Sequence, residues 1–371
     1  MNQVNAAVAA NTWPAPPVVS TLFSWGYNAN GRLGDGTTTN RSSPVQIGAL
    51  TTWGTNLGRG FDQNSAVINN TGTLYAWGTN NYGQLGDGTT TNTSSPVQIG
   101  AMTNWAQIVV SDPTLAIKTD GTLWSWGSNN YGQLGLGNIT NYSSPKQVGS
   151  LATWSFVACN SDYTMAIKTD GTLWAWGRNN SGQLGLGNLT SYSSPKQVGA
   201  LTTWLTAAAG RYRGSYAITT TGLLYSWGTG TFGQLGLNNT TSYSSPKQVG
   251  ALTNWSTVTA GSGHVLSKKT DGTMWSWGRS TSGQLGLGNV TYYSSPKQVG
   301  SLTTWSSAVA GGRTSFARKT NGTIWSWGSG EFGGGGLGTV SDYSSPRQIG
   351  ALTSWLGITA FYAGGSAVKS V

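Results

Sequence analysis

The chain has 371 residues, 56 of them Gly and 19 of them Trp, and its formal net charge at pH 7 is +10. Charged residues make up 8% of it, against about 25% in ordinary globular domains, and the many tryptophans argue against a disordered chain, which is poor in aromatic residues. Because the chain has one His and one Cys, its composition excludes an internal disulfide and argues against acid–base catalysis, which usually draws on His or on paired carboxylates.

Residues 1–20 are predicted to form an extended arm outside the folded domain. Pro14, Pro16 and Pro17 disfavour pairing with a sheet and favour a tether. Trp13 and the alanines before it suggest that the arm contacts a neighbouring subunit or a host structure. We expect no secretion signal, because no basic segment precedes an apolar one, and no membrane insertion, because no apolar run approaches roughly 20 residues. The expected location is therefore a virion or the cytoplasm.

Residues 21–371 are predicted to form one array of seven repeats. Two markers recur at intervals of 49 to 52 residues, a Trp-Gly pair and a Ser-Ser-Pro triplet. The pairs begin at Trp25, Trp77, Trp126, Trp176, Trp227, Trp277 and Trp327, and the triplets end at Pro44, Pro96, Pro145, Pro195, Pro246, Pro296 and Pro346. Each unit of such an array buries its faces against its neighbours, so the chain can exceed the roughly 250–300 residues of a single core.

The third repeat predicts four short strands, at 106–110, 114–118, 122–126 and 145–148. β-Favouring residues flank Asp120-Gly121, which is a strong hairpin signal because Gly adopts the positive φ of a primed turn. Pro145 has no amide proton to donate to a neighbouring strand, so we expect it to begin an edge strand. No segment shows a helical period over several turns.

An aromatic residue lies two positions before the tryptophan of every Trp-Gly pair, and only Ser or Ala lies between the two rings, as in Trp124-Ser125-Trp126. Successive side chains of a strand point to opposite faces of its sheet. One face of each sheet therefore carries large rings and the other carries a small residue. Sheets packed face to face need this complementarity to reach interior packing density, so we expect the aromatic residues to pack between neighbouring sheets.

Four-stranded sheets repeated around an axis predict an all-β fold, a seven-bladed β-propeller. The first repeat begins with its third strand, near Thr21. The chain ends with segments that match a first and a second strand, at 357–360 and 366–369. We therefore expect the first blade to be closed by strands from both the N-terminus and the C-terminus.

These motifs resemble the repeat of the regulator of chromosome condensation family. The resemblance lies in Asp-Gly-Thr-Leu followed by Trp-Gly and Asn-x-x-Gly-Gln-Leu-Gly, as in 120–135, and it spans Thr21 to Val371. It implies a seven-bladed propeller closed by both termini. It also implies action through partners, by nucleotide exchange on a small GTPase, by contact with chromatin or by inhibition of β-lactamases.

Two departures from that family argue against exchange activity. The near-constant repeat length leaves no room for the inserted wedge that the exchange factor uses against its GTPase. The family's histidine before the second strand is also absent from most repeats, and only His264 stands in such a place.

The sequence predicts no catalytic residue, no metal site and no cofactor. His264 is expected to be a structural turn residue and Cys159 a small buried side chain. No His/Cys cluster has the spacing of a zinc site, and the Asp-Gly pairs lack the further carboxylates of a calcium loop. Gly-Gln-Leu-Gly is not followed by the Lys of a phosphate loop, so its Gln is expected to fix the loop through backbone hydrogen bonds.

Basic residues recur at two positions of the repeat, and two interpretations are open for them. One set ends second strands and the other opens fourth strands. The first comprises Lys118, Lys168, Lys269, Lys319 and Lys369, and the second comprises Lys146, Lys196, Lys247, Lys297 and Arg347. These rings either protect sheet edges and solubility or attract an anionic partner. A protein with an anionic surface is the favoured partner, and nucleic acid is not favoured.

The link between the first and second strands differs from repeat to repeat, from LGRGFDQNS at 57–65 to FYAGGS at 361–366. In a four-stranded blade it lies at the same end as the long loop between the third and fourth strands. Variation on one face of a uniform scaffold favours recognition there, although neutral drift of loops is the alternative. The predicted partner contacts, rich in the Arg and Tyr of binding hot spots, are Arg59, Phe61, Asp162, Tyr163, Arg211, Tyr212, Arg213, Arg313 and Tyr362.

Two functions follow from this pattern, both of them non-enzymatic. The first is an assembly or surface component, such as a structural protein of a phage virion, which suits loops rich in Ser, Thr, Asn and Gly. The second is an intracellular regulator or inhibitor that binds a partner, as the family resemblance implies. The sequence favours the first.

Overall fold

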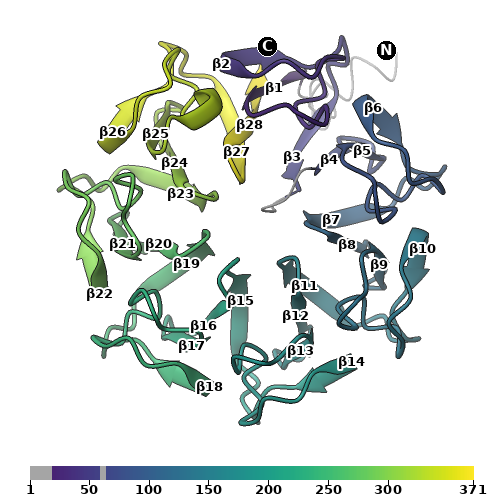
Figure 1. Cartoon of the computed structure of the whole chain (residues 1–371), viewed down its shortest axis with the longest axis vertical. Coiled ribbons are helices and arrows are strands. Elements are labelled where there is room, and N and C mark those ends of the chain that lie inside the picture. Colours follow the sequence, from purple (N-terminus) through teal and green to yellow (C-terminus); the bar gives the residue numbers. More distant parts are fainter. Residues whose placement is uncertain (1–18, 59–63) are drawn as a thin grey trace, which may run out of the picture.

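The computed structural model describes residues 19–58 and 64–371, so the predicted arm lies outside the described residues except for Val19 and Ser20. The described chain forms seven four-stranded antiparallel sheets arranged as blades around a central axis (Figure 1). The first strand of each blade lies nearest the axis and the fourth lies at the outer rim. The predicted all-β, seven-bladed propeller is confirmed.

The strands follow the repeat along the chain. Blade 1 contains β1 (Ser20–Gly26), β2 (Arg41–Gln46), β27 (Trp355–Phe361) and β28 (Gly364–Ser370). Blade 2 contains β3 (Trp53–Leu57), β4 (Asn64–Asn69), β5 (Leu74–Gly78) and β6 (Thr93–Gln98). Blade 3 contains β7 (Trp105–Val110), β8 (Pro113–Lys118), β9 (Leu123–Gly127) and β10 (Tyr142–Gln147). Blade 4 contains β11 (Trp154–Cys159), β12 (Tyr163–Lys168), β13 (Leu173–Gly177) and β14 (Tyr192–Gln197).

The remaining blades repeat the same order. Blade 5 contains β15 (Trp204–Ala209), β16 (Gly214–Thr219), β17 (Leu224–Gly228) and β18 (Tyr243–Gln248). Blade 6 contains β19 (Trp255–Ala260), β20 (His264–Lys269), β21 (Met274–Gly278) and β22 (Tyr293–Gln298). Blade 7 contains β23 (Trp305–Ala310), β24 (Thr314–Lys319), β25 (Ile324–Gly328) and β26 (Tyr343–Gln348), with the short 3₁₀ helix η1 (Glu331–Gly333) before β26. Within the described ranges, no helix is long and apolar enough to span a membrane.

Blade 1 joins the two ends of the chain, as the sequence predicted. Its strand order is β2-β1-β28-β27, so β28 lies between the N-terminal β1 and the C-terminal β27. Leu22 is paired with Val368, and the Val371 amide donates a hydrogen bond to the Val19 carbonyl at 3.0 Å. The ring is therefore closed by main-chain hydrogen bonds between the first and last described strands.

Pro145 lies inside its strand and not at its beginning. β10 begins at Tyr142, three residues earlier than predicted, and its pairing with β9 is irregular between Tyr142 and Lys146. This irregularity releases Pro145 from the ladder, so its missing amide proton is tolerated. The predicted position at a sheet edge is confirmed, because β10 is the outermost strand of its blade.

The hairpin at Asp120-Gly121 is confirmed, but its turn is not a primed one. Gly121 has a φ of 81° and its amide donates to the Lys118 carbonyl at 2.9 Å, whereas Asp120 is not among the described residues with positive φ. This is the geometry of a type I turn followed by a glycine bulge. The Asp120 carboxylate accepts hydrogen bonds from the Thr122 hydroxyl (2.7 Å) and amide (2.9 Å), which lower the pKa of Asp120 and stabilise this alternative.

The large-against-small packing between blades is confirmed. Trp126 packs in one core cluster with Ala76 of the preceding blade, and Trp227 packs with Ala175 in the same way. The Trp227 indole Nε1 also donates to the main-chain carbonyl of Gln183 in the preceding blade, at 2.9 Å. Within the described chain, six of the seven Trp-Gly tryptophans make this bond, with acceptors Arg32, Gln84, Gln133, Gln183, Gln234 and Gln284.

The junction between blades 7 and 1 lacks this bond. The last loop has Gly334 where the others have Gln or Arg, and the buried Nε1 of Trp25 has no hydrogen-bond partner. The closing interface therefore has the same packing as the others but one polar contact fewer.

We predict that Trp227→Phe lowers the free energy of unfolding by about 1 kcal/mol more than Trp25→Phe. Both changes remove the same atoms from a fully buried site, but only the first removes a hydrogen bond, whose net contribution is about 0.5–1.5 kcal/mol. Chemical denaturation of the two variants measures the difference. Equal losses would show that the indole–carbonyl bond contributes nothing to the interface.

We predict that deleting residues 366–371 lowers the free energy of unfolding by more than about 2 kcal/mol. The deletion removes most of β28, including the fully buried Val368, whose burial alone is worth about 1.5–3 kcal/mol, and leaves β1 and β27 with unpaired edges. The control is deletion of Val371 alone, a residue that is 78% exposed. Equal thermal stability of the full-length chain and the six-residue deletion would contradict the closure argument.

Candidate functional site

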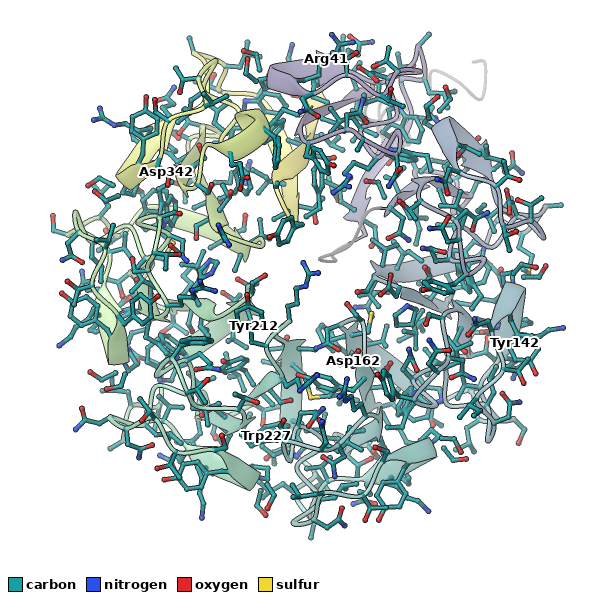
Figure 2. All side chains as sticks on the ribbon, in the orientation of Figure 1. Arg41, Tyr142, Asp162, Tyr212, Trp227 and Asp342 are labelled. Carbon is teal, nitrogen blue, oxygen red and sulfur yellow. The ribbon has the colours of Figure 1, made fainter. Side chains whose placement is uncertain are left out.

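The variable links and the long loops lie at one end of the propeller, as predicted. In the blades whose link is fully described, main-chain hydrogen bonds join the two, for example from Arg178 N to Asp162 O at 3.0 Å and from Arg279 N to Gly263 O at 2.8 Å. We call this end of the molecule the link face. In the view along the axis, Asp162 and Tyr212 lie closer to the centre, whereas Arg41 and Tyr142 lie at the outer rim (Figure 2).

The structure removes one residue from the predicted contact set. Tyr163 is fully buried, and its hydroxyl donates to the Gly214 carbonyl at 2.9 Å and lies 2.9 Å from Ser215 Oγ. Burial raises the pKa of Tyr163 well above its usual range. Its side chain ties blade 4 to blade 5 and does not face a partner. Arg59 and Phe61 lie outside the described residues.

Asp162 and Arg213 are brought together in an ion-pair cluster. Asp162 Oδ2 lies 3.3 Å from Arg178 Nη1 and 3.5 Å from Arg213 Nε. The Arg178 guanidinium also lies over the ring of Tyr131, 4.6 Å from its centre, and donates to the Tyr131 hydroxyl at 3.1 Å. Two cations and one carboxylate are therefore fixed between blades 4 and 5.

Tyr212 belongs to a second cluster, which is aromatic. Its ring centre lies 5.7 Å from that of Phe232, and Phe232 lies 6.2 Å from Tyr292. Arg279 Nη1 donates to the Tyr212 hydroxyl at 3.1 Å, and the guanidinium lies 5.3 Å from the Phe232 ring. Burial disfavours the cation, but hydrogen bonds to Tyr292 and Tyr212 outweigh it and raise the pKa of Arg279.

The other predicted contacts lie beside these clusters. The Arg211 guanidinium lies over the Tyr362 ring at 4.8 Å, so these two residues, far apart in sequence, meet on the link face. Arg313 is half-buried at the end of the link before β24. That these residues contact a partner stays a prediction.

Sequence reasoning missed Arg178, Arg279 and Tyr292. A signal for the arginines was present, because only two of the seven Trp-Gly pairs are followed by Arg, and the others are followed by Tyr, Thr or Ser. Comparing the repeats position by position, and not only link by link, would have found both. The same comparison would have found Tyr292, because the other repeats have Asn, Ser or Asp at its position, as in Asn141 and Ser242.

The first lysine set does not form a ring of free charge. The ammonium of Lys118 lies 3.9 Å from the ring centre of Trp124 and 5.2 Å from that of Trp105, and Lys168, Lys269 and Lys319 repeat this contact. Where the strand ends in Asn69 or Thr219 instead, the ring is Tyr75 or Tyr225 and not Trp. Since Trp is the best cation–π partner, this pairing indicates that four of the five lysines pack together with tryptophans, whereas Lys369 lies in the blade that has Phe23 at this position.

The second set lies on the outer strands. Lys146 is exposed, and its ammonium lies 5.5 Å from the Tyr142 ring centre in the same strand. The prediction that these residues open their strands is wrong. The strands begin earlier, so the residues occupy the fifth of six strand positions. They remain available to solvent at the sheet edges.

His264 is buried but is not the predicted turn residue, because it is the first residue of β20. His264 Nε2 lies 2.9 Å from Ser315 Oγ, which in turn donates to the Gln284 carbonyl, so Nε2 is the donor. It occupies in blade 6 the place that Tyr163 occupies in blade 4, and burial lowers its pKa to about 3. Cys159 is buried. The predicted role of Gln in the loop is confirmed by Gln133 Oε1, which accepts from the Tyr131 amide at 2.8 Å.

The innermost strands enclose a cavity of about 210 Å³ on the axis. Its lining is uncharged and comes from the innermost strands of all seven blades, with small apolar side chains on most of them and the polar Asn56 and Gln107 on β3 and β7. Among the described residues, no group of three or more His, Cys, Asp or Glu residues is placed to hold a metal ion.

The sequence matches the "Regulator of chromosome condensation (RCC1) repeat" over residues 20–56, 71–112, 120–167, 170–213, 221–267 and 271–318. These ranges cover well over half of the chain. The chain belongs to the RCC1 repeat family. A second form of the RCC1 repeat matches residues 154–183 and 255–284, the segments that carry the two link-face arginines Arg178 and Arg279.

Several solved structures share the fold. The crystal structure of human WBSCR16 is similar with a TM-score of 0.84 and 18% identity, over 95% of this chain and 99% of that chain. Yeast RCC1 (Prp20), in a structure bound to Kap60, has a TM-score of 0.82 and 20% identity over 95% and 89%. Prp20p from Saccharomyces cerevisiae, in a study of its binding to Gsp1p and histones, has a TM-score of 0.80 and 22% identity over 95% and 92%.

We predict that the free energy of unfolding falls by about 2 kcal/mol between pH 7 and pH 5 because of His264. The folded state holds its pKa near 3, whereas the unfolded value is about 6.5, so below pH 6.5 the unfolded chain binds a proton that the folded chain excludes. Denaturation curves of the wild type and His264→Gln at both pH values isolate this contribution, since the chain has a single His. An equal pH-dependent loss in both proteins would contradict it.

Proposed function

We propose that the protein is a non-enzymatic RCC1-type propeller that binds a protein partner through its link face, and that it acts as a regulator or inhibitor of that partner. The observation that carries this proposal is the gathering of Arg and aromatic side chains between blades 4 and 7. Tyr212 and Tyr292 are 37% and 43% exposed, and each lies against an arginine or another ring. Exposed rings held in place by neighbours present contact area at low entropic cost, and Tyr and Arg are enriched in hot spots.

The distribution of charge supports a partner with an anionic surface. Residues 204–371 carry twelve of the 20 Lys and Arg residues but only three of the ten Asp and Glu residues. The net charge therefore lies almost entirely in blades 5 to 7 and the C-terminal strands of blade 1. A symmetric ring with a one-sided charge favours one orientation of an acidic partner.

The family comparison favours the second of the two functions considered. One solved relative is bound to Kap60, and another was studied for binding to Gsp1p and histones, so partner binding is a use to which this fold is put. The virion hypothesis draws no support from the matched family or from these structures, and we do not propose it.

We predict that Tyr212→Ala weakens binding of a protein partner by more than about 1–2 kcal/mol, as expected of a hot-spot residue. The partner is obtained by affinity purification with the full-length protein from an extract of the source organism, and its affinity is then measured with purified components. Tyr212 is partly exposed, so its loss does not require unfolding.

Lys146→Ala is the matched control, because it removes an exposed side chain from the outer rim. It is expected to change the affinity less than twofold. Binding that survives Tyr212→Ala but disappears at high salt would contradict a link-face interface and would indicate a polyanion held by distributed charge.

A further inference from the structure

We propose that the link face holds an anion-binding site centred on Arg279, between blades 6 and 7, which takes the carboxylate of an acidic side chain from a protein partner. This inference rests on the proposed function, because it names the chemistry by which that partner is recognised. It comes from a comparison of two repeats of the same chain, one of which carries its own carboxylate.

The copy that carries its own carboxylate, which we call the template, lies between blades 4 and 5. There Asp162 Oδ2 accepts from Arg178 Nη1 at 3.3 Å and lies 3.5 Å from Arg213 Nε. The Arg178 guanidinium lies 4.6 Å from the Tyr131 ring centre. One carboxylate is thus held by two arginines and flanked by one aromatic ring.

The same backbone frame recurs between blades 6 and 7. Arg279 N donates to Gly263 O at 2.8 Å, as Arg178 N donates to Asp162 O at 3.0 Å. Gly263 therefore stands where the template has its carboxylate, and Arg279 stands where the template has Arg178.

The second arginine and the ring are also present in this copy. Ser329 N donates to Arg313 O at 2.9 Å, as Thr229 N donates to Arg213 O at 3.0 Å, so Arg313 corresponds to Arg213. The Phe232 ring lies 5.3 Å from the Arg279 guanidinium, in the role of Tyr131. This copy therefore keeps both arginines and the aromatic ring and lacks only the carboxylate.

The missing carboxylate leaves hydrogen-bonding groups unsatisfied. Within residues 19–58 and 64–371, no carboxylate forms an ion pair with Arg279 or Arg313. Arg279 Nε is buried without a partner, and so is the hydroxyl of Ser262, the residue before Gly263, which is 4% exposed. Buried donors in folded proteins are nearly always paired, so this cluster is suited to an acceptor supplied from outside.

Arg279 is the principal residue of the site and Arg313 its second contact. The link of blade 5 has one residue more than that of blade 7, and Arg213 has a φ of 61°, whereas Arg313 is not among the described residues with positive φ. Arg279 has no such difference from its counterpart. A Cβ at Gly263 would lie 3.1 Å from Tyr212 Cδ2 and 3.3 Å from Arg279 Cβ, so both side chains pack close to this glycine.

The surroundings favour a carboxylate on a polypeptide. A guanidinium binds a carboxylate through two parallel hydrogen bonds, and the internal occupant of the template is itself an Asp side chain. The rings of Tyr212, Phe232 and Tyr292 surround Arg279 with apolar surface that suits the methylene groups of Glu or Asp.

The test is isothermal titration of the full-length protein with a hexaglutamate peptide. We expect one binding site, at least tenfold weaker binding to Arg279→Gln, and no binding of hexaglutamine. Arg178→Gln is the matched control, because it removes the same charge from the template that Asp162 already occupies, and it is expected to change the affinity less than twofold. Equal effects of the two substitutions, or equal binding of hexaglutamine, would overturn the proposal.

A gain-of-site variant gives an independent reading. Asp162→Asn frees the template arginines and is expected to raise the stoichiometry from one peptide to two. Should Arg279→Gln fail to fold by circular dichroism, Gly263→Asp replaces it, since its internal carboxylate is expected to block the peptide in a folded protein. Unchanged peptide binding to folded Gly263→Asp would overturn the proposal.

Inorganic phosphate distinguishes a small-anion site from a peptide site. We expect phosphate to displace hexaglutamate only at concentrations at least tenfold higher, and phosphate that binds more tightly than the peptide would overturn the assignment to an acidic side chain. These titrations need no natural partner. If the peptide titrations show no site but Tyr212→Ala still weakens partner binding, the anion site is refuted and the proposed function stands. If the peptide binds at Arg279 but Tyr212→Ala leaves partner binding unchanged, the partner interface is refuted and the anion site stands.

Discussion

The packing of each Trp-Gly indole against a loop of the preceding blade is the contact on which the ring depends, because it is present at every junction between described blades, including the one that lacks the indole–carbonyl hydrogen bond. It fixes how closely two sheets approach, and it demands a glycine in the loop that meets the indole, because a Cβ at Gly185 would lie 2.7 Å from Trp227 Nε1. The face opposite each large ring must carry a small residue for the same reason. Since these requirements are met outside the links between first and second strands, the links can change without loss of the fold.

The fold was predictable because its determinants are local and repeated. Seven copies of Trp-Gly, the small residue before it and the split first repeat predict blade number, packing and closure together. Strand starts and turn type were not predictable, since the bulge at Pro145 and the Asp120–Thr122 hydrogen bonds decide them. The sequence predicted which end of the propeller carries the candidate site, but not which side chains face solvent there. Tyr163 and Tyr212 both come from the variable links, yet Tyr163 points into the interface between blades and Tyr212 faces solvent. The direction in which a side chain of a short link points depends on the length of that link, and the link of blade 5 is one residue longer than that of blade 4.

The basic residues divide into groups with different physical roles. Lys118 and its counterparts bury their ammonium groups against tryptophan, so their charge is largely used within the blade, and burial lowers the pKa of Lys269 and Lys319. The link-face arginines lie against tyrosine and phenylalanine instead, and a guanidinium stacked on a ring keeps hydrogen-bonding edges for a further acceptor. The same excess charge thus contributes to packing at one position of the repeat and to recognition at another.

The hydrogen bond between Val371 and Val19 places the two ends of the propeller side by side in blade 1. Ends that touch can be joined by a short linker, and the chain can be opened at any exposed segment between two blades, such as residues 250–253 between β18 and β19. Such a circular permutant keeps every contact between blades and makes blade 1 continuous. The blade that is shared by the termini is therefore a property of where the chain is cut and not of the seven-fold scaffold.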